Sequence, residues 1–301
     1  MNKIFITGAN GFLGQHLCLF LASNGHTVIA SGRGACRIPL REKFEYAELD
    51  IIDKEAVQHC LQWHQPSVII HTAALSKPDE CNNNKESCLL NNVTATKYLI
   101  EAAQSIAPHF IYTSTDFIFG ENGPHGEEDT PAPLNFYGES KLMAEKIVKE
   151  SDLLFSIIRP VFMYGAVWEG MRPSFLHWVK DNLEQKKSIK VVNDQLRTPT
   201  FVNDICKGIE AVIEHRANGD FHLAGKDIIS PYQMAIKVAD ILQLDTSLIE
   251  SVDSENFPEP VQRAKRSGLK IDKAMKVLGY TPVSFEEGIK LTFSLQDKIL
   301  T

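Results

Sequence analysis

Short runs of apolar, often β-branched residues alternate along the first half of the chain with longer stretches in which apolar residues recur every three or four positions. The short runs predict strands and the longer stretches predict amphipathic helices. Such alternation is typical of an α/β fold with a parallel sheet. We expect strands near Lys3–Thr7, Thr27–Ala30, Glu45–Glu48, Val68–His71, His109–Thr113 and Phe155–Arg159, and helices at Leu13–Ser23, Lys54–Gln62, Cys88–Ile106 and Tyr137–Lys149.

The alternation loses its regularity beyond Arg159-Pro160. We therefore expect a first domain over residues 1–160 and a smaller, discontinuous α/β substrate-binding lobe over residues 161–301, with some segments returning to the first sheet. In this second part we expect helices near Pro173–Glu184, Val202–Glu214, Pro231–Leu242 and Phe285–Leu295, and short strands at Ile189–Val192 and Asp220–Leu223.

Composition narrows the class of protein. The chain has 301 residues, a net charge of -7, 44% hydrophobic and 23% charged residues, which is ordinary for a globular protein. The acidic balance argues against nucleic acid or an anionic membrane as partner. The six cysteines include no Cys-x-x-Cys pair, and no signal peptide or transmembrane run is visible. We expect a cytoplasmic protein with reduced thiols and no metal site.

A glycine-rich loop follows the first strand directly. Gly8, Gly11 and Gly14 are spaced as G-x-x-G-x-x-G and open a helix, and the same loop contains Asn10, Phe12 and Leu13. This context predicts a dinucleotide pyrophosphate at the helix N-terminus and makes the fold a Rossmann-type doubly wound sheet. The alternative is a strand–turn–helix junction that needs glycines only for its geometry.

The end of the second strand indicates which dinucleotide binds. A fold that prefers NAD places an acidic residue there, about 20 residues after the glycine loop. This chain has Ser31-Gly32-Arg33 with no carboxylate. A guanidinium can bind a 2′-phosphate and Ser31 can donate its hydroxyl, so we predict NADP as cofactor, with NADPH preferred over NADH. The alternative is that Arg33 is a solvated surface residue.

Tyr137 and Lys141 are four residues apart and share one face of a predicted helix. A phenol has an unperturbed pKa of about 10, and a nearby ammonium would lower the pKa of Tyr137 toward neutral pH, where it could serve as an acid–base catalyst. Tyr-x-x-x-Lys is commonplace on helix surfaces. Here it follows Ser114-Thr115 at the end of the fifth strand, which favours a catalytic reading.

Together these motifs resemble the extended short-chain dehydrogenase/reductase superfamily, and within it the dTDP-4-dehydrorhamnose reductase family. The resemblance spans nearly the whole chain and rests on Ser114–Phe119, Pro133–Gly138, Arg159-Pro160, Arg197–Thr200 and Val202-Asn203-Asp204. It implies that Thr115, Tyr137 and Lys141 are catalytic. It also implies that the cofactor contacts Asp50, Ile51, Thr72, Ala73, Ala74, Asn92, Tyr137, Lys141 and Pro160, and that the substrate contacts Ser76, Thr115, Asp116, Phe117 and Arg197.

Several of these assignments have structural alternatives. Asn92 could be an ordinary polar helix position, Pro160 a strand terminator and Arg197 part of an internal ion pair. His71 fits a buried strand end better than a ligand or a base. The family's Arg-Pro-x-Asn motif is replaced by Arg263-Ala264-Lys265-Arg266, which implies a different sugar.

The predicted reaction is NADPH-dependent reduction of a 4-keto group on a nucleotide-activated deoxysugar by a possible homodimer. Related dehydratases carry Asp-Glu where this chain has Asp116-Phe117, so the second carboxylate for dehydration is missing. Related epimerases retain NAD, which an acidic residue at the end of the second strand would suit, whereas this chain has Arg33 there. The chain also resembles the regulatory β subunits of methionine adenosyltransferase, at His71–Ala74, Lys77-Pro78-Asp79 and Gly219–His222. That resemblance implies an alternative, a non-catalytic NADP-binding regulatory subunit; a nucleotide-sugar epimerase is the other.

Overall fold

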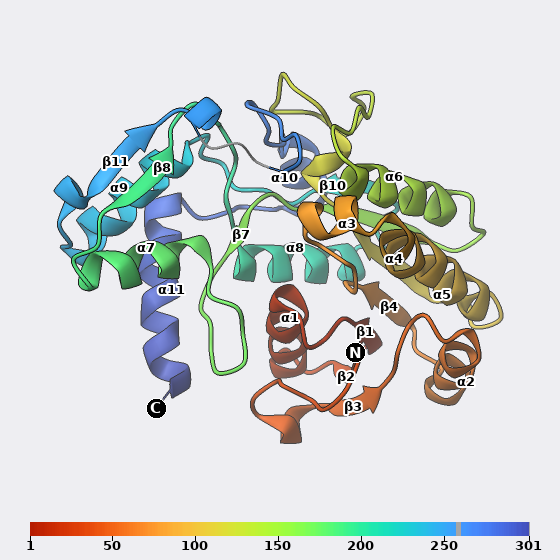
Figure 1. Cartoon of the computed structure of the whole chain (residues 1–301). Coiled ribbons are helices and arrows are strands. Elements are labelled where there is room, and N and C mark those ends of the chain that lie inside the picture. Colours follow the sequence, from red (N-terminus) through yellow and green to blue (C-terminus); the bar gives the residue numbers. More distant parts are fainter. Residues whose placement is uncertain (257–259, 301) are drawn as a thin grey trace.

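The computed structural model of the chain describes residues 1–256 and 260–300. Its centre is a seven-stranded, wholly parallel sheet with the strand order β10-β6-β5-β4-β1-β2-β3, seen at the centre and right of Figure 1. The predicted α/β fold is thus confirmed. The strands are β1 (Lys3–Thr7), β2 (Thr27–Gly32), β3 (Glu45–Glu48), β4 (Val68–His71), β5 (His109–Thr113), β6 (Phe155–Arg159) and β10 (Gly219–His222).

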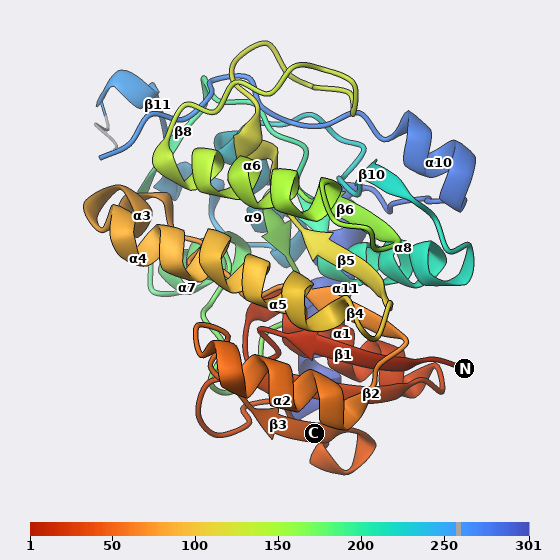
Figure 2. The ribbon, with the colours of Figure 1, turned by 90° about the vertical axis from the view of Figure 1, so that its right-hand side faces the viewer.

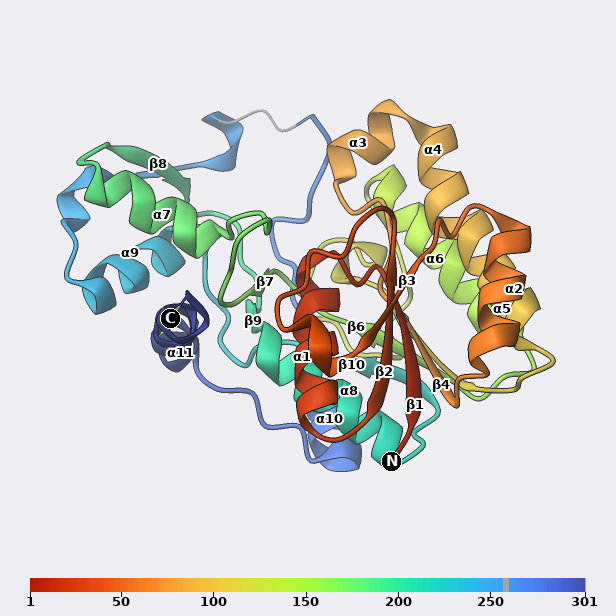
Figure 3. The ribbon, with the colours of Figure 1, turned by 90° about the horizontal axis from the view of Figure 1, so that it is seen from below.

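Helices cover both faces of this sheet. On one face α2 (Lys54–His64), α5 (Ala95–Ala103) and α6 (Phe136–Lys149) lie in a row, as Figure 2 shows. On the other face lie α1 (Phe12–Ser23), α8 (Val202–Glu214) and α10 (Asp272–Leu278) (Figure 3). Successive strand residues point to opposite faces. Ile4 and Ile6 therefore pack with α1 and α8, while Phe5 packs in the cluster of α2 and α5.

The sheet draws on both halves of the chain. Its edge strand β10 pairs in parallel with β6, from Gly219 opposite Ser156 to His222 opposite Arg159. Helix α8, which also follows residue 160, buries Ile205 and Ile209 against the same core as Leu17 of α1. The division at residue 160 stays a prediction.

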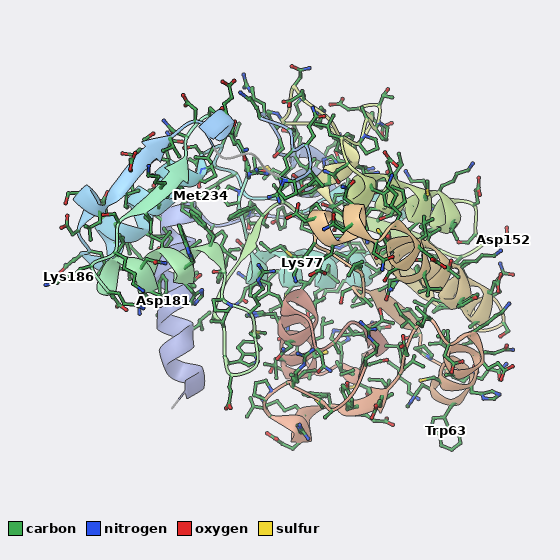
Figure 4. The ribbon with its side chains drawn as sticks, in the orientation of Figure 1. Trp63, Lys77, Asp152, Asp181, Lys186 and Met234 are labelled. Atoms are coloured by element: carbon green, nitrogen blue, oxygen red, sulfur yellow. The ribbon has the colours of Figure 1, made fainter. Side chains whose placement is uncertain are left out.

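A second lobe lies beside the sheet, at the left of Figure 1. It contains α7 (Phe175–Glu184) and α9 (Pro231–Leu242), which pack against a parallel pair, β8 (Ile189–Val192) with β11 (Ile249–Val252), and α11 (Phe285–Leu300), which packs against α9. Met234 lies inside this lobe and is fully buried, whereas Trp63 projects from α2 and is 82% exposed (Figure 4). A short pair, β7 (Met163–Tyr164) with β9 (Thr200–Phe201), lies between the lobes.

The predicted helix Cys88–Ile106 corresponds to a helical stretch that begins at Lys85 and ends at Ala103. It consists of α4 (Lys85–Leu89), a π-helical turn over Leu90–Thr94 and α5, and a short helix that was not predicted, α3 (Pro78–Asn83), precedes it. Inside the π turn, the buried Asn92 amide accepts a hydrogen bond from Leu75 N at 2.7 Å and donates one to Leu75 O at 3.1 Å. The turn lies within a longer helical stretch, and the sequence prediction did not include it. Among the described residues, no helix is both long and apolar enough to cross a membrane.

Candidate functional site

A cavity of about 510 Å³ opens at the carboxyl ends of β1, β4, β5 and β6. In the strand order, β1 and β4 are the neighbours at which the connections switch direction, which is where open α/β sheets bind ligands. Most of the residues predicted for the site line this cavity: Gly8, Asn10, Gly11, Phe12, Leu13, Gly14, Arg33, Ile51, Thr72, Ala73, Ala74, Ser76, Thr115, Asp116, Phe117, Tyr137, Lys141 and Pro160.

The glycine loop has no room for a side chain at Gly8 or Gly14. Gly8 has a φ of 68°, and a Cβ on it would lie 2.6 Å from Ala73 N. A Cβ on Gly14 would lie 2.3 Å from the Gly8 carbonyl oxygen. The loop also forms the N-terminus of α1, which favours an anion. Its geometry therefore fits the pyrophosphate of a dinucleotide.

Two exposed arginines, Arg33 and Arg37, line the cavity next to this loop. Ser31 does not line it: its side chain is fully buried in the sheet, and its Oγ has no hydrogen-bond partner among the described residues. Asp50 is also outside the lining: its carboxylate accepts from Ile52 N at 3.2 Å, and its neighbours Leu49 and Ile51 line the wall. The wall next to the glycine loop thus presents two cations.

Lys141 is buried one turn after Tyr137 on α6. Its Nζ donates to Thr113 O at 2.7 Å and lies 4.2 Å from the centre of the Tyr112 ring. Burial lowers the pKa of Lys141 to about 7, although the negative charge of Glu145 acts to raise it.

The expected lowering of the pKa of Tyr137 by Lys141 is wrong for this geometry. Burial raises the pKa of the Tyr137 phenol, and a hydrogen bond with Thr115 only partly opposes this shift. The ammonium of Lys141 is directed at a backbone carbonyl and a ring, so it does not offset the burial. Tyr137 therefore stays protonated at neutral pH.

Thr115 lies at the end of β5 with an extended backbone. Its Oγ1 accepts from Phe117 N at 3.2 Å and donates to Asp116 Oδ1, also at 3.2 Å. The Phe117 ring packs edge-on against Tyr137, with centroids 5.5 Å apart. The structure thus brings the three predicted catalytic side chains to one end of the cavity.

Asn92 and His71 support this site from behind. Asn92 Nδ2 donates to Ser140 Oγ at 3.0 Å, between Tyr137 and Lys141, and its neighbour Asn91 lines the cavity instead. His71 is buried between Thr7 and Thr96, at 2.7 and 3.0 Å, and burial lowers its pKa to about 3. A neutral imidazole at a strand end, with a hydrogen bond at each ring nitrogen, agrees with the structural role predicted for His71.

Arg197 lies outside the main cavity and lines a second one of about 280 Å³. Asp116 and Phe117 line both cavities, as does Phe162, whose φ of 37° is strained for a bulky residue. Arg197 is buried and its Nη2 donates to Gln195 Oε1, so it has an internal partner. The remaining wall comes mostly from the second lobe and consists of Phe175, Trp178, Lys190, Val191, Val192, Pro231 and Arg263.

Other lining residues were not predicted. Thr113 and Gly32 are direct neighbours of predicted positions and could have been inferred from strand ends, whereas Ser114, the predicted alternative to Thr115 at the same strand end, lines the cavity too. Phe162 and Met163 follow β6, and the second-lobe residues reach the site only through tertiary packing, so no local pattern marks them. All six cysteines are free, and no group of three or more metal-ligating side chains occurs within residues 1–256 and 260–300.

Comparison with known proteins agrees with this geometry. A family described as RmlD substrate binding domain matches residues 1–297. The β subunit of mouse methionine adenosyltransferase 2 is 35% identical, over 96% of this chain and 86% of that protein. The probable low-salt glycan biosynthesis reductase Agl14 of Haloferax volcanii is 30% identical, over 95% of each.

A solved structure of dTDP-4-dehydrorhamnose reductase from Bacillus anthracis, in complex with NADP, superposes with a TM-score of 0.83. It is 26% identical and the match covers 98% of this chain and 99% of that one. The resemblance predicted from the motifs is confirmed. The chain therefore belongs to the RmlD substrate-binding domain family, which matches it over nearly its whole length.

Proposed function

We propose that this protein reduces the 4-keto group of a nucleotide-activated deoxysugar and uses NADPH as the reductant. The observation that carries this proposal is that one cavity holds both the glycine loop and the Thr115, Tyr137 and Lys141 side chains. A dinucleotide seated on the loop and a carbonyl beside Tyr137 would meet in that cavity.

The residues fit the cofactor. The Gly8–Gly14 loop suits a pyrophosphate, and Arg33 and Arg37 provide positive charge for a 2′-phosphate. When bound, NADPH supplies the hydride for carbonyl reduction. Lys141 would hold the nicotinamide ribose and so orient the cofactor relative to Tyr137.

In this reaction Tyr137 is the proton donor. A phenol has an ordinary pKa of about 10, and burial raises that of Tyr137, so the group is protonated at neutral pH and can give its proton to the strongly basic alkoxide that develops on the reduced carbon. Thr115, which lines the same cavity, would donate to the same oxygen and stabilise the growing charge. Thr115 Oγ1 currently donates to Asp116, so it must turn to do so.

The second cavity supports a nucleotide-sugar substrate. It adjoins the Tyr137 cavity at Asp116 and Phe117, and it offers Arg197, Arg263 and the half-exposed Trp178. Guanidinium groups suit a diphosphate and an indole suits a stacked base. The sugar would then extend toward Tyr137. The absence of a second carboxylate after Asp116 favours reduction over dehydration.

A coupled assay tests this function. Nucleotide-4-keto-6-deoxysugars are generated in situ with different bases, and NADPH oxidation is followed at 340 nm with and without the protein. We expect turnover with at least one of these substrates and none with the parent nucleotide-glucose. Binding of NADPH without oxidation on any member of the panel would contradict the proposal.

The second candidate is an NADP-binding regulatory subunit without turnover. The observation that favours it is the 35% identity to a protein named as a subunit of methionine adenosyltransferase. Size-exclusion chromatography with the catalytic chain of that enzyme tests it. Co-elution together with inactivity on the sugar panel would favour the regulatory function, whereas turnover without co-elution would favour the reductase.

A further inference from the structure

Tyr46 lies in the middle of β3 and its hydroxyl reaches the turn after β2. The hydroxyl is within donating distance of two carbonyl oxygens, Gly32 O at 3.0 Å and Gly34 O at 2.8 Å. It also accepts a hydrogen bond from Asn10 Nδ2 at 2.9 Å. A single phenol oxygen therefore joins the glycine loop to both ends of the Gly32–Gly34 segment.

The Asn10 side chain completes this set of contacts. Its Nδ2 lies 3.2 Å from Arg33 O and 3.1 Å from Ala35 O, and its Oδ1 accepts from Arg37 N at 2.9 Å. Asn10 was predicted to bind cofactor, and its amide is directed at this turn. Between them Tyr46 and Asn10 hold the backbone of the whole turn from Gly32 to Arg37.

The glycine loop is fixed in turn from the other side. Gln15 Nε2 donates to Asn10 O at 3.1 Å, and Trp168 Nε1 donates to Gln15 Oε1 at 2.6 Å. Trp168 and Gln15 are both buried. The loop for the pyrophosphate and the turn that carries Arg33 and Arg37 thus form one hydrogen-bonded unit.

We propose that Tyr46 is a positioning residue for recognition of the NADP 2′-phosphate, because its hydroxyl fixes the turn from which Arg33 and Arg37 extend. This inference rests on the NADP preference of the proposed function. The two arginine side chains are exposed, so their backbone must be held in place if they are to meet a phosphate at low entropic cost. NADH has no 2′-phosphate to meet these arginines, and the pyrophosphate loop that it shares with NADPH keeps the contact of Gln15 with Asn10 O.

Tyr46→Phe removes the hydroxyl and keeps the ring. Fluorescence titration of the full chain should show NADPH binding weakened about 3- to 10-fold, the range for one net hydrogen bond, and NADH binding nearly unchanged. Tyr232→Phe, in the hydrophobic cluster of the second lobe, is the matched control and should change neither affinity. Equal weakening of both cofactors by Tyr46→Phe would overturn the inference, since it would indicate a general structural role.

A second variant tests the inference in case Tyr46→Phe does not fold. Gly34 has a φ of 67° and open space where a Cβ would point, so Gly34→Ala strains the turn without a clash. It should produce the same selective loss of NADPH affinity. An unchanged NADPH affinity in Gly34→Ala, with Tyr46→Phe unable to fold, would count against the inference.

A double-mutant comparison tests whether Tyr46 affects NADPH binding through Arg33 and Arg37. In an Arg33→Ala/Arg37→Ala background, Tyr46→Phe should no longer change the NADPH:NADH ratio, because the groups that it positions are gone. A full effect in that background would overturn the inference. If the wild-type protein binds both cofactors equally, the NADP preference itself fails; if it prefers NADPH and Tyr46→Phe keeps that preference, only the role of Tyr46 fails.

Discussion

Arg159 and Glu145 form a buried, two-contact ion pair, with Nε to Oε1 at 2.9 Å and Nη2 to Oε2 at 2.7 Å. Each side chain is only 1% exposed. The pair joins the end of β6 to α6, one turn beyond Lys141. Asp220 of β10 contacts the same Nη2 at 2.6 Å, so a single guanidinium links three elements that surround the site.

Breaking this pair should destabilise the fold. Removing one partner of a buried ion pair leaves the other charge without full compensation, which costs about 3–5 kcal/mol. We expect Glu145→Gln to lower the free energy of unfolding by about 3 kcal/mol, the lower figure because Asp220 remains. Urea denaturation measures it. Glu150→Gln is the control: this residue caps the C-terminus of the same helix, forms an exposed pair with Lys146, and its substitution should cost less than about 0.5 kcal/mol. Equal losses in the two variants would show that the buried pair contributes no more to stability than the exposed one.

The depressed pKa of Lys141, about 7, predicts how stability depends on pH. Between pH 7 and about 10.4 the unfolded chain binds a proton at this lysine that the native state lacks, so Lys141 makes stability rise with pH. Below pH 7 the native state carries the full cost of the buried ammonium. Lys141→Met should therefore be most stabilising, relative to wild type, near pH 6, and this advantage should shrink toward pH 10. Denaturant titrations at several pH values test this, and a difference independent of pH would refute it.

Removing only the hydroxyl of Tyr137 separates binding from chemistry. Tyr137→Phe keeps the ring against Phe117, so NADPH affinity should change little. Loss of the general acid should slow reduction of an accepted sugar by about 10²–10⁴. Thr115→Val should cost less, because the proton donor remains. Single-turnover kinetics with prebound NADPH gives both rates, and a Tyr137→Phe variant as fast as wild type would exclude Tyr137 as the acid.

Arg33→Ala should weaken NADPH far more than NADH. A charge-assisted hydrogen bond contributes roughly 1.5–3 kcal/mol, which corresponds to a fall in preference of about 10- to 100-fold. Titration of both nucleotides measures the ratio. Arg216→Ala, at an exposed residue by the amino ends of the strands, is the charge-matched control. If Arg33→Ala weakens both nucleotides equally, Arg33 does not recognise the 2′-phosphate.

Local sequence patterns predicted the part of the site that is formed by strand ends and by one face of a helix. The Gly8–Gly14 loop, Thr115 and the Tyr137–Lys141 pair each follow directly from a strand end or a helix face, and the structure brings them into one cavity. The sequence could not show that Lys141 Nζ would turn to Thr113 O, because that depends on burial and on a backbone carbonyl. Nor could it reveal the contact between Tyr46 and Gly34, which a strand residue makes only after the sheet has formed.

The second half of the chain was predicted less completely. Strands β7 and β9 have two residues each, too few for a periodic pattern, and β11 was not predicted either. Arg263 and Trp178 come to the second cavity from segments far apart in sequence. Their meeting depends on how the lobe packs, which no local window contains.

The pairing of β10 with β6 bears on how the protein is made. A chain emerging from the ribosome completes β6 at Arg159, yet the strand that covers its edge does not follow until Gly219–His222. In that interval the nascent sheet has an open edge, and the face of α1 that later meets α8 is bare apolar surface. Open strand edges and bare apolar faces promote aggregation. We therefore expect protection by chaperones to matter most while the segment between these two strands is being synthesised.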